Sequence, residues 1–139
     1  GICLDTVKRF GASTPIIGVC LGHQAIGEAY GAITKHAEKC IHGKASIIEH
    51  DGHGLFADTP LPMKVGRYHS LIVEPNDTCP LQILSTTAEG EIMAFKHPAH
   101  PVYGVQFHPE SVLTEFGQTM VDNFVDLAIH HSKLQQSAA

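Results

Sequence analysis

The sequence has few positive charges and no long apolar run. Of its 139 residues, 9 are Lys or Arg and 14 are Asp or Glu, which gives a formal net charge of −5. The cations are scattered, so the chain has no basic surface of the kind that binds nucleic acid or an anionic membrane. No apolar stretch approaches the roughly 18 residues of a membrane-spanning helix, and no signal peptide opens the chain. We therefore expect a cytoplasmic protein that binds neither nucleic acid nor membranes.

The four cysteines lie far apart, and no two of them form a CxxC pair. This spacing argues against a dense disulfide framework and against a zinc knuckle, so we expect free thiols. His36, Cys40 and His42 lie close together in the sequence, but their spacing matches no common zinc pattern. Polar residues on a solvated strand face explain them better. We expect neither a metal nor another cofactor.

The chain begins with Gly1 rather than methionine and opens directly on a helix-like segment. With 43% hydrophobic residues it can bury one core, so we expect a single domain over residues 1–131 and a frayed tail over residues 132–139. The abrupt opening favours a fragment of a longer domain.

The apolar pattern predicts an α/β fold. Residues 2–11 have helical spacing, residues 16–19 form a short apolar strand, and a second helix runs to about residue 30. A helix that leads into a wholly apolar strand is typical of a parallel sheet covered on both faces. Later strand-like runs are separated by turn signals and predict antiparallel pairs beside that sheet; they span residues 33–36, 45–50, 63–68, 71–74, 81–87, 92–97 and 102–107. A helical stripe follows from about residue 114.

A reactive cysteine is predicted at the corner between the first strand and the second helix. Residues 18–24 read GVCLGHQ, which is the layout of a nucleophile elbow with Cys20 at its tip. Glycines tolerate the crowding of such a turn, and the N-terminal amides of the following helix favour a thiolate. The alternative is that Cys20 is a small buried hydrophobic residue beside two turn glycines.

A cysteine nucleophile needs a base and a group that orients the base. Residues 104–110 read GVQFHPE, a strand that ends in His-Pro-Glu. In extended backbone His108 and Glu110 point to the same side, so the carboxylate can accept from one imidazole nitrogen while the other faces the thiol. The alternative is a strand-end histidine capped by a local carboxylate.

These two motifs together resemble the class I, triad-type glutamine amidotransferases. Residues 42–44 (HGK) and 66–71 (GRYHSL) resemble the branch that serves chorismate enzymes, namely the small subunits of anthranilate synthase and aminodeoxychorismate synthase. The resemblance extends from Gly1 to about Phe124. It implies a mixed, mostly parallel sheet with helices on both faces, here without its first strands. It also implies glutamine as the substrate and, as the partner, a chorismate-utilising synthase large subunit.

The resemblance implies a role for each matching residue. Cys20 attacks the side-chain amide of glutamine, His108 transfers protons and Glu110 holds the imidazole. The backbone amide of Leu21 donates to the oxyanion. The substrate-binding positions are Gln24, Ser70 and Leu71, the last two as a backbone clamp.

The family's other oxyanion donors lie in a Gly- and Pro-rich loop upstream of the segment that matches Gly1. That loop has no counterpart here, and losing one donor costs about 100- to 1000-fold in rate. We therefore expect the 139-residue chain alone to be poorly active.

Other functions remain open on the sequence. The same module could serve another acceptor, in carbamoyl phosphate or GMP synthesis, although residues 42–44 and 67–71 disfavour this. A cysteine hydrolase of similar fold would keep Cys20 and His108 but would not need Gln24 or the clamp. A non-catalytic regulatory module of the same fold is the third alternative.

Overall fold

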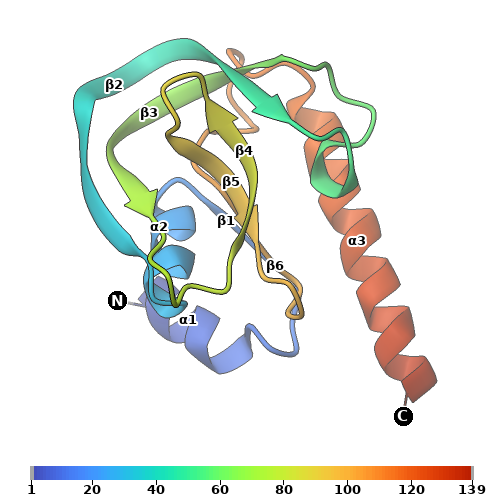
Figure 1. The fold of residues 1–139 in the computed structure, drawn as a ribbon. Coiled ribbons are helices and arrows are strands. Elements are labelled where there is room, and N and C mark those ends of the chain that lie inside the picture. Colours follow the sequence, from blue (N-terminus) through green and yellow to red (C-terminus); the bar gives the residue numbers. More distant parts are fainter. Residues whose placement is uncertain (1, 139) are drawn as a thin grey trace.

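The computed structural model describes the backbone of residues 2–138, and the side chains within that range except at positions 38–42, 70 and 138. Its elements follow one another along the chain as shown in Figure 1. They are α1 (Ile2–Phe10), β1 (Ile16–Val19), α2 (Leu21–Ala29), β2 (Ile33–His50), the 3₁₀ helix η1 (Gly54–Phe56), β3 (Met63–Glu74), β4 (Gln82–Thr87), β5 (Ile92–Lys96), β6 (Val102–Val105) and α3 (Gly117–Ala138).

The described strands form one mixed sheet in the order β1-β6-β5-β4-β2-β3. The expected mixed sheet is confirmed, but the expectation that most pairs are parallel is wrong for the described residues. Among the described strands, only β1 and β6 pair in parallel, and the other pairs are antiparallel. The reason is connectivity, because β4, β5 and β6 follow one another through short turns, and a parallel pair needs a long crossover.

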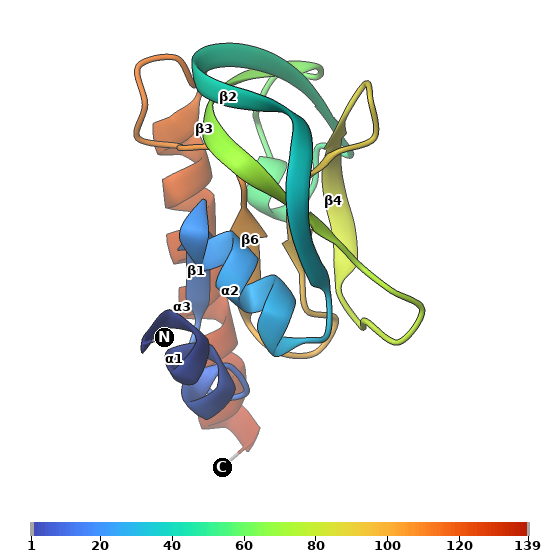
Figure 2. The same cartoon turned by 90° about the vertical axis from the view of Figure 1, so that its left-hand side faces the viewer.

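Strands β2 and β3 are much longer than the sequence predicts. The predicted runs 33–36 and 45–50 are the two ends of β2, and the runs 63–68 and 71–74 are both parts of β3. The polar segment between the ends of β2 keeps its pairing with β3 through shifts in register, between His36 and Ile41 and again between His42 and Lys44. Such bulges let a strand bend without ending, and the hairpin curls over the rest of the sheet in Figures 1 and 2.

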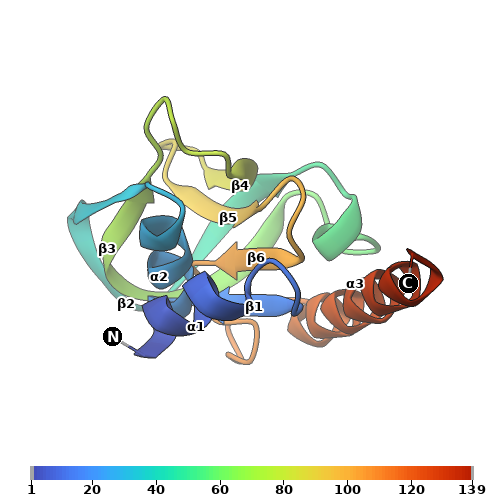
Figure 3. The ribbon, with the colours of Figure 1, turned by 90° about the horizontal axis from the view of Figure 1, so that it is seen from below.

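Helices cover both faces of the sheet, as expected. Along β6, Val102 belongs to a core cluster that includes Val7 of α1 and Ile26 of α2. Its neighbour Tyr103 packs against a second cluster, which includes Met120 of α3. Because successive strand residues point to opposite faces, α1 and α2 lie on one side and α3 on the other, as Figure 3 shows from below.

Helix α3 begins at Gly117 and continues to Ala138, through the segment where the sequence predicts a frayed tail from residue 132. Lys133, Leu134 and Gln135 are good helix formers, which accounts for the extra turns. None of the helices in the described part of the chain is long and apolar enough to cross a membrane.

Candidate functional site

Cys20 lies at the corner between β1 and α2, as the elbow motif predicts. Its amide donates to Val105 O (2.9 Å), which extends the β1–β6 ladder by one residue. Its carbonyl accepts from Gln24 N (3.1 Å), the first turn of α2. The residue has a φ of 54° and a ψ of −101°, a strained conformation for a side chain with a Cβ. Strain of this kind is characteristic of nucleophile elbows.

The two glycines of the motif have different roles. A Cβ at Gly18 would lie 2.5 Å from the carbonyl carbon and oxygen of Gly22, so only glycine lets β1 and α2 approach so closely. A Cβ at Gly22 would meet nothing within 4 Å. The crowding predicted for both glycines therefore applies to Gly18 alone.

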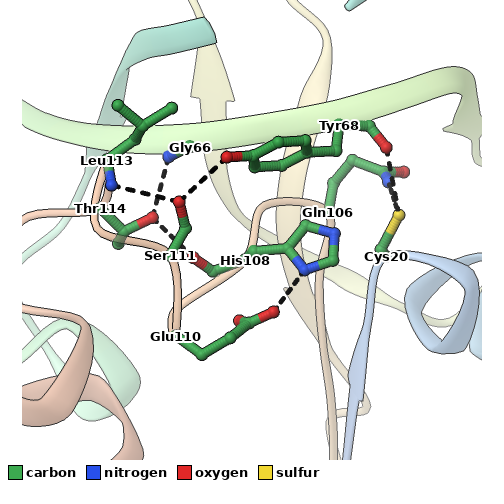
Figure 4. A network of polar contacts seen from close by, with 9 residues as sticks. All are labelled: Cys20, Gly66, Tyr68, Gln106, His108, Glu110, Ser111, Leu113 and Thr114. Carbon is green, nitrogen blue, oxygen red and sulfur yellow. Dashed lines mark hydrogen bonds and ion pairs between the residues drawn. The ribbon is translucent and has the colours of Figure 1, made fainter. Parts of the chain in front are cut away.

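The Cys20 thiol is half-buried and held by two polar partners (Figure 4). It donates to Tyr68 O (3.8 Å) and accepts from Gln106 Nε2 (3.7 Å). Burial raises the pKa of the Cys20 thiol, with a smaller contribution from the charge of Glu110. The Leu21 amide and the Gln106 amide act in the opposite direction. The expected stabilisation of a thiolate by the helix N-terminus is thus present, but burial outweighs it.

His108 and Glu110 form the pair that the sequence predicts. His108 Nδ1 lies 2.5 Å from Glu110 Oε1, which is a short, charge-assisted contact. The backbone of His108 is held at both ends, since its amide donates to Gly66 O (3.1 Å) and its carbonyl accepts from Thr114 Oγ1 (2.6 Å). In Figure 4 the His108 ring lies between the Glu110 carboxylate and Cys20. The hydrogen bonds described for Cys20 Sγ do not include one to His108.

Gln24 and Leu71 contact each other in the interior beside the thiol. Gln24 is 7% exposed, and its Nε2 donates to Leu71 O (3.4 Å) and to Gln106 Oε1 (3.4 Å). Ser70 precedes Leu71 in β3, and its side chain lies outside the described residues. Leu21 is the first residue of α2 and is 72% exposed, with its backbone amide at the thiol.

Sequence reasoning did not single out Gln106 and His23, which are both fully buried. Gln106 Oε1 accepts from His23 Nδ1 (3.2 Å). Burial lowers the pKa of His23 to about 3, so the ring is neutral near pH 7. A signal was present for Gln106, because it is a polar residue between Val105 and Phe107 in the otherwise apolar run 102–107 that the sequence predicts as a strand.

A second network of buried polar side chains is connected to the carbonyl oxygen of Leu71 through His69. Arg67 is 4% exposed; its Nε donates to His69 Nε2 (2.9 Å), and its guanidinium pairs with Glu91 (3.1 Å). His69 Nδ1 in turn donates to Leu71 O (2.9 Å). A cavity of about 500 Å³ is lined by Arg67 and Glu91, but by neither Cys20 nor His108. This cavity therefore lies away from the candidate nucleophile.

The predicted absence of a metal site stays a prediction. The described residues contain no group of three or more possible metal ligands. Two members of the His36, Cys40 and His42 group, however, have side chains outside the described residues.

The fold and the two motifs agree with a comparison against protein families. The chain belongs to the class I glutamine amidotransferase family, whose model matches residues 1–128. It is 48% identical over 128 residues to the aminodeoxychorismate/anthranilate synthase component 2 of Bacillus subtilis, covering 91% of this chain and 66% of that protein. It is 44% identical over 126 residues to the anthranilate synthase component 2 of Methanothermobacter thermautotrophicus, covering 90% and 63%. The chain thus spans about two thirds of the length of these relatives.

A solved structure shares the fold. The structure of a protein from Thermoplasma acidophilum, described as one subunit of a GMP synthase, superposes with a TM-score of 0.85 at 24% identity. The match covers 96% of this chain and 67% of that one. At this identity the likeness supports the architecture rather than the acceptor.

Proposed function

We propose that this chain carries out the glutaminase step of a reaction that aminates chorismate. The observation that supports the chemistry most directly is that a strained Cys20 and a paired His108 and Glu110 follow the carboxyl ends of two neighbouring parallel strands, with the His108 ring between Glu110 and Cys20 (Figure 4). The names of the B. subtilis and M. thermautotrophicus relatives support chorismate as the acceptor.

In the proposed reaction the Cys20 sulfur attacks the side-chain carbonyl carbon of glutamine. The thiol proton passes to His108 Nε2, while Glu110 accepts the hydrogen bond from Nδ1 and stabilises the imidazolium. The Leu21 amide donates to the developing oxyanion. Collapse of the tetrahedral intermediate breaks the C–N bond, and His108 returns the proton to the leaving nitrogen, which departs as ammonia.

The second half of the proposed reaction hydrolyses the glutamyl thioester. His108 takes a proton from water as the water oxygen attacks the thioester carbon. The C–S bond then breaks to release glutamate, and His108 returns the proton to the Cys20 sulfur. Gln24, Ser70 and Leu71 are the proposed contacts for the amino-acid end of glutamine. Ammonia then passes to a chorismate-utilising synthase partner, whose product is anthranilate or the aminated precursor of para-aminobenzoate.

The test uses the chain together with that synthase partner. Substituting Cys20→Ser should abolish amination supported by glutamine and leave amination supported by ammonium salts intact. Cys79→Ser is the matched control, because Cys79 is a free cysteine that packs against the core cluster containing Val7. Loss of the ammonia-supported reaction in the Cys20→Ser variant would contradict the proposal, as would survival of the glutamine-supported one.

A covalent probe tests the substrate separately. A diazo-ketone analogue of glutamine should label Cys20, and excess glutamine should slow the labelling. A general cysteine-peptidase inhibitor that labels Cys20 faster, with no protection by glutamine, would favour a hydrolase of similar fold instead.

A further inference from the structure

The side chain of Gln106 connects the candidate nucleophile to the interior. Its Oε1 accepts from His23 Nδ1 (3.2 Å) and from Gln24 Nε2 (3.4 Å), and its Nε2 donates to Cys20 Sγ (3.7 Å). Two donors surround the amide oxygen, so the amide cannot flip without turning its NH₂ group toward them. The donor end of the amide is thereby fixed toward the sulfur.

We propose that Gln106 is a positioning residue for the Cys20 thiol, holding the sulfur in place and stabilising its thiolate form through a fixed N–H donor. This inference rests on the proposed function, since it takes Cys20 to be the nucleophile. Hydrogen bonds to an ionised acceptor are roughly twice as strong as neutral ones, so the same contact is worth more once the thiol has lost its proton.

His23 fixes the orientation of the Gln106 amide. The His23 ring stacks on Phe95 with the ring centres 4.2 Å apart and an angle of 15° between the planes. Burial keeps the ring neutral, so it has a single N–H, and the acceptor at 3.2 Å assigns that proton to Nδ1. Gly104 makes the arrangement possible, because a Cβ there would lie 2.9 Å from His23 Cδ2 and 2.4 Å from Phe95 Cε1.

The groups around the Cys20 sulfur act in opposite directions on its pKa, and Gln106 is one of those that lower it. Burial and the charge of Glu110 both disfavour the thiolate, and the groups that favour it are the Leu21 amide and Gln106. Of these two groups the Leu21 amide has the larger effect on the pKa, and Gln106 is the side chain that adds to it. Gln24 and Cys20 both form hydrogen bonds with the side-chain amide of Gln106. This amide therefore couples a proposed substrate contact to the candidate nucleophile.

The pH dependence of Cys20 alkylation tests this role. Iodoacetamide reacts with the thiolate, and peptide mass spectrometry follows Cys20 separately from the other cysteines. Gln106→Met keeps the side-chain volume and removes the donor, so we expect roughly tenfold slower alkylation at pH 8 and a midpoint at higher pH. Gln106→Glu places a negative charge beside the sulfur, so the shift should be larger. Circular dichroism checks that each variant is folded.

Matched variants at Gln82, an exposed residue of β4, are the controls. Gln82→Met and Gln82→Glu should leave the alkylation profile of Cys20 unchanged. His23→Leu is a second route to the same question, because it removes an anchor of the amide and leaves Gln106 in place. It should shift the profile in the same direction by a smaller factor.

An unchanged profile in the folded Gln106 variants would overturn the inference. If those variants do not fold, an unchanged profile in His23→Leu overturns it. The proposed function fails differently: wild-type Cys20 would then not react with the glutamine analogue, while the shift in the alkylation profile would persist.

Discussion

At the scale of single residues, burial disfavours the ionised form of the candidate nucleophile, Cys20. Burial raises the pKa of the Cys20 thiol, so at neutral pH the proton stays on sulfur, and the proposed reaction requires a base to remove it. The candidate base is His108, whose Nδ1 lies 2.5 Å from Glu110 Oε1. This leaves Nε2 as the nitrogen able to accept a proton. In the proposed mechanism, the Glu110 contact therefore decides which nitrogen of His108 acts as the base.

Replacing Glu110 tests the proposed roles of the two His108 nitrogens. Glu110→Gln keeps the shape and removes the charge that fixes the His108 tautomer and stabilises the imidazolium. We expect glutamine-supported synthesis with the partner to fall by about 100-fold or more, with ammonia-supported synthesis unchanged. Glu89→Gln, at an exposed turn position, is the control and should be silent. A decrease below threefold would remove Glu110 from the mechanism.

His23 makes stability depend on pH in a defined direction. Its pKa is about 3 in the folded chain, against an ordinary value of 6.5 for an unfolded chain, so between those values the unfolded chain binds the extra proton. Its contribution to stability is complete above pH 6.5 and is lost as the pH falls toward 3, with a slope of about 1.4 kcal/mol per pH unit. Urea unfolding at several pH values in this range gives the unfolding free energy at each pH. For His23→Gln, this free energy should change less steeply with pH than it does for the wild type. His53→Gln, which alters an exposed histidine, should keep the wild-type slope.

At the scale of elements, the corner between β1 and α2 depends on close approach of the two backbones. The motif contains two glycines, but only Gly18 faces a neighbour that would clash with a side chain. The strained Cys20 lies between them and takes the last sheet hydrogen bond and the first helix hydrogen bond. The direction of the thiol is therefore set by how tightly the helix lies on the strand.

Alanine at each glycine separates the two roles. Gly18→Ala places a Cβ 2.5 Å from Gly22 C and O, so we expect a loss of about 2 kcal/mol in unfolding free energy and slower labelling of Cys20. Gly22→Ala meets no neighbour within 4 Å and lies in a helix, where alanine is favoured by about 0.5–1 kcal/mol. Urea unfolding of both variants measures this. Equal destabilisation would show that crowding at Gly18 does not govern the corner.

Local pattern predicted the short elements well and the long hairpin poorly. The strand Ile16–Val19 coincides with the prediction because a run without polar side chains lies between Pro15 and Cys20. The sequence predicts two strands in place of β2 because Glu38, Lys39, His42 and Lys44 interrupt the apolar pattern, together with Gly43, which has a φ of 61°. Its continuity depends on pairing with β3, a long-range interaction that the residues of β2 alone do not encode.

At the scale of the whole molecule, the parallel pairing of β1 and β6 assembles the candidate site. The register pairs Gly18 with Gly104 and Val19 with Val105, so Cys20 and Gln106 follow side by side at the ends of the two strands. Motif reading predicted Cys20, His108 and Glu110 because their chemistry is local. The contacts of Gln106 depend on this register and on the space left by the missing side chain of Gly104, and neither can be read from the sequence.

Helix α3 packs on the far side of the sheet from α2, and its contacts there allow a last prediction. Asn123 Nδ2 donates to Leu55 O (3.0 Å) and to Ala57 O (2.8 Å), joining α3 to the segment around η1. Asn123→Ala leaves both carbonyls without this donor, so we expect a loss of about 1–3 kcal/mol in stability. Gln118→Ala, which removes an exposed contact to Asp122, is the control and should cost under about 0.5 kcal/mol.

The alkylation profile of Cys20 distinguishes a local effect of Asn123→Ala from a global one. Because α3 packs on the opposite face from α2, the folded variant should show the wild-type profile at room temperature. Thermal unfolding should nevertheless occur at a lower temperature. If the profile shifts together with the unfolding temperature, the two faces of the sheet are coupled, and the site depends on packing of the whole domain rather than on the β1–β6 edge.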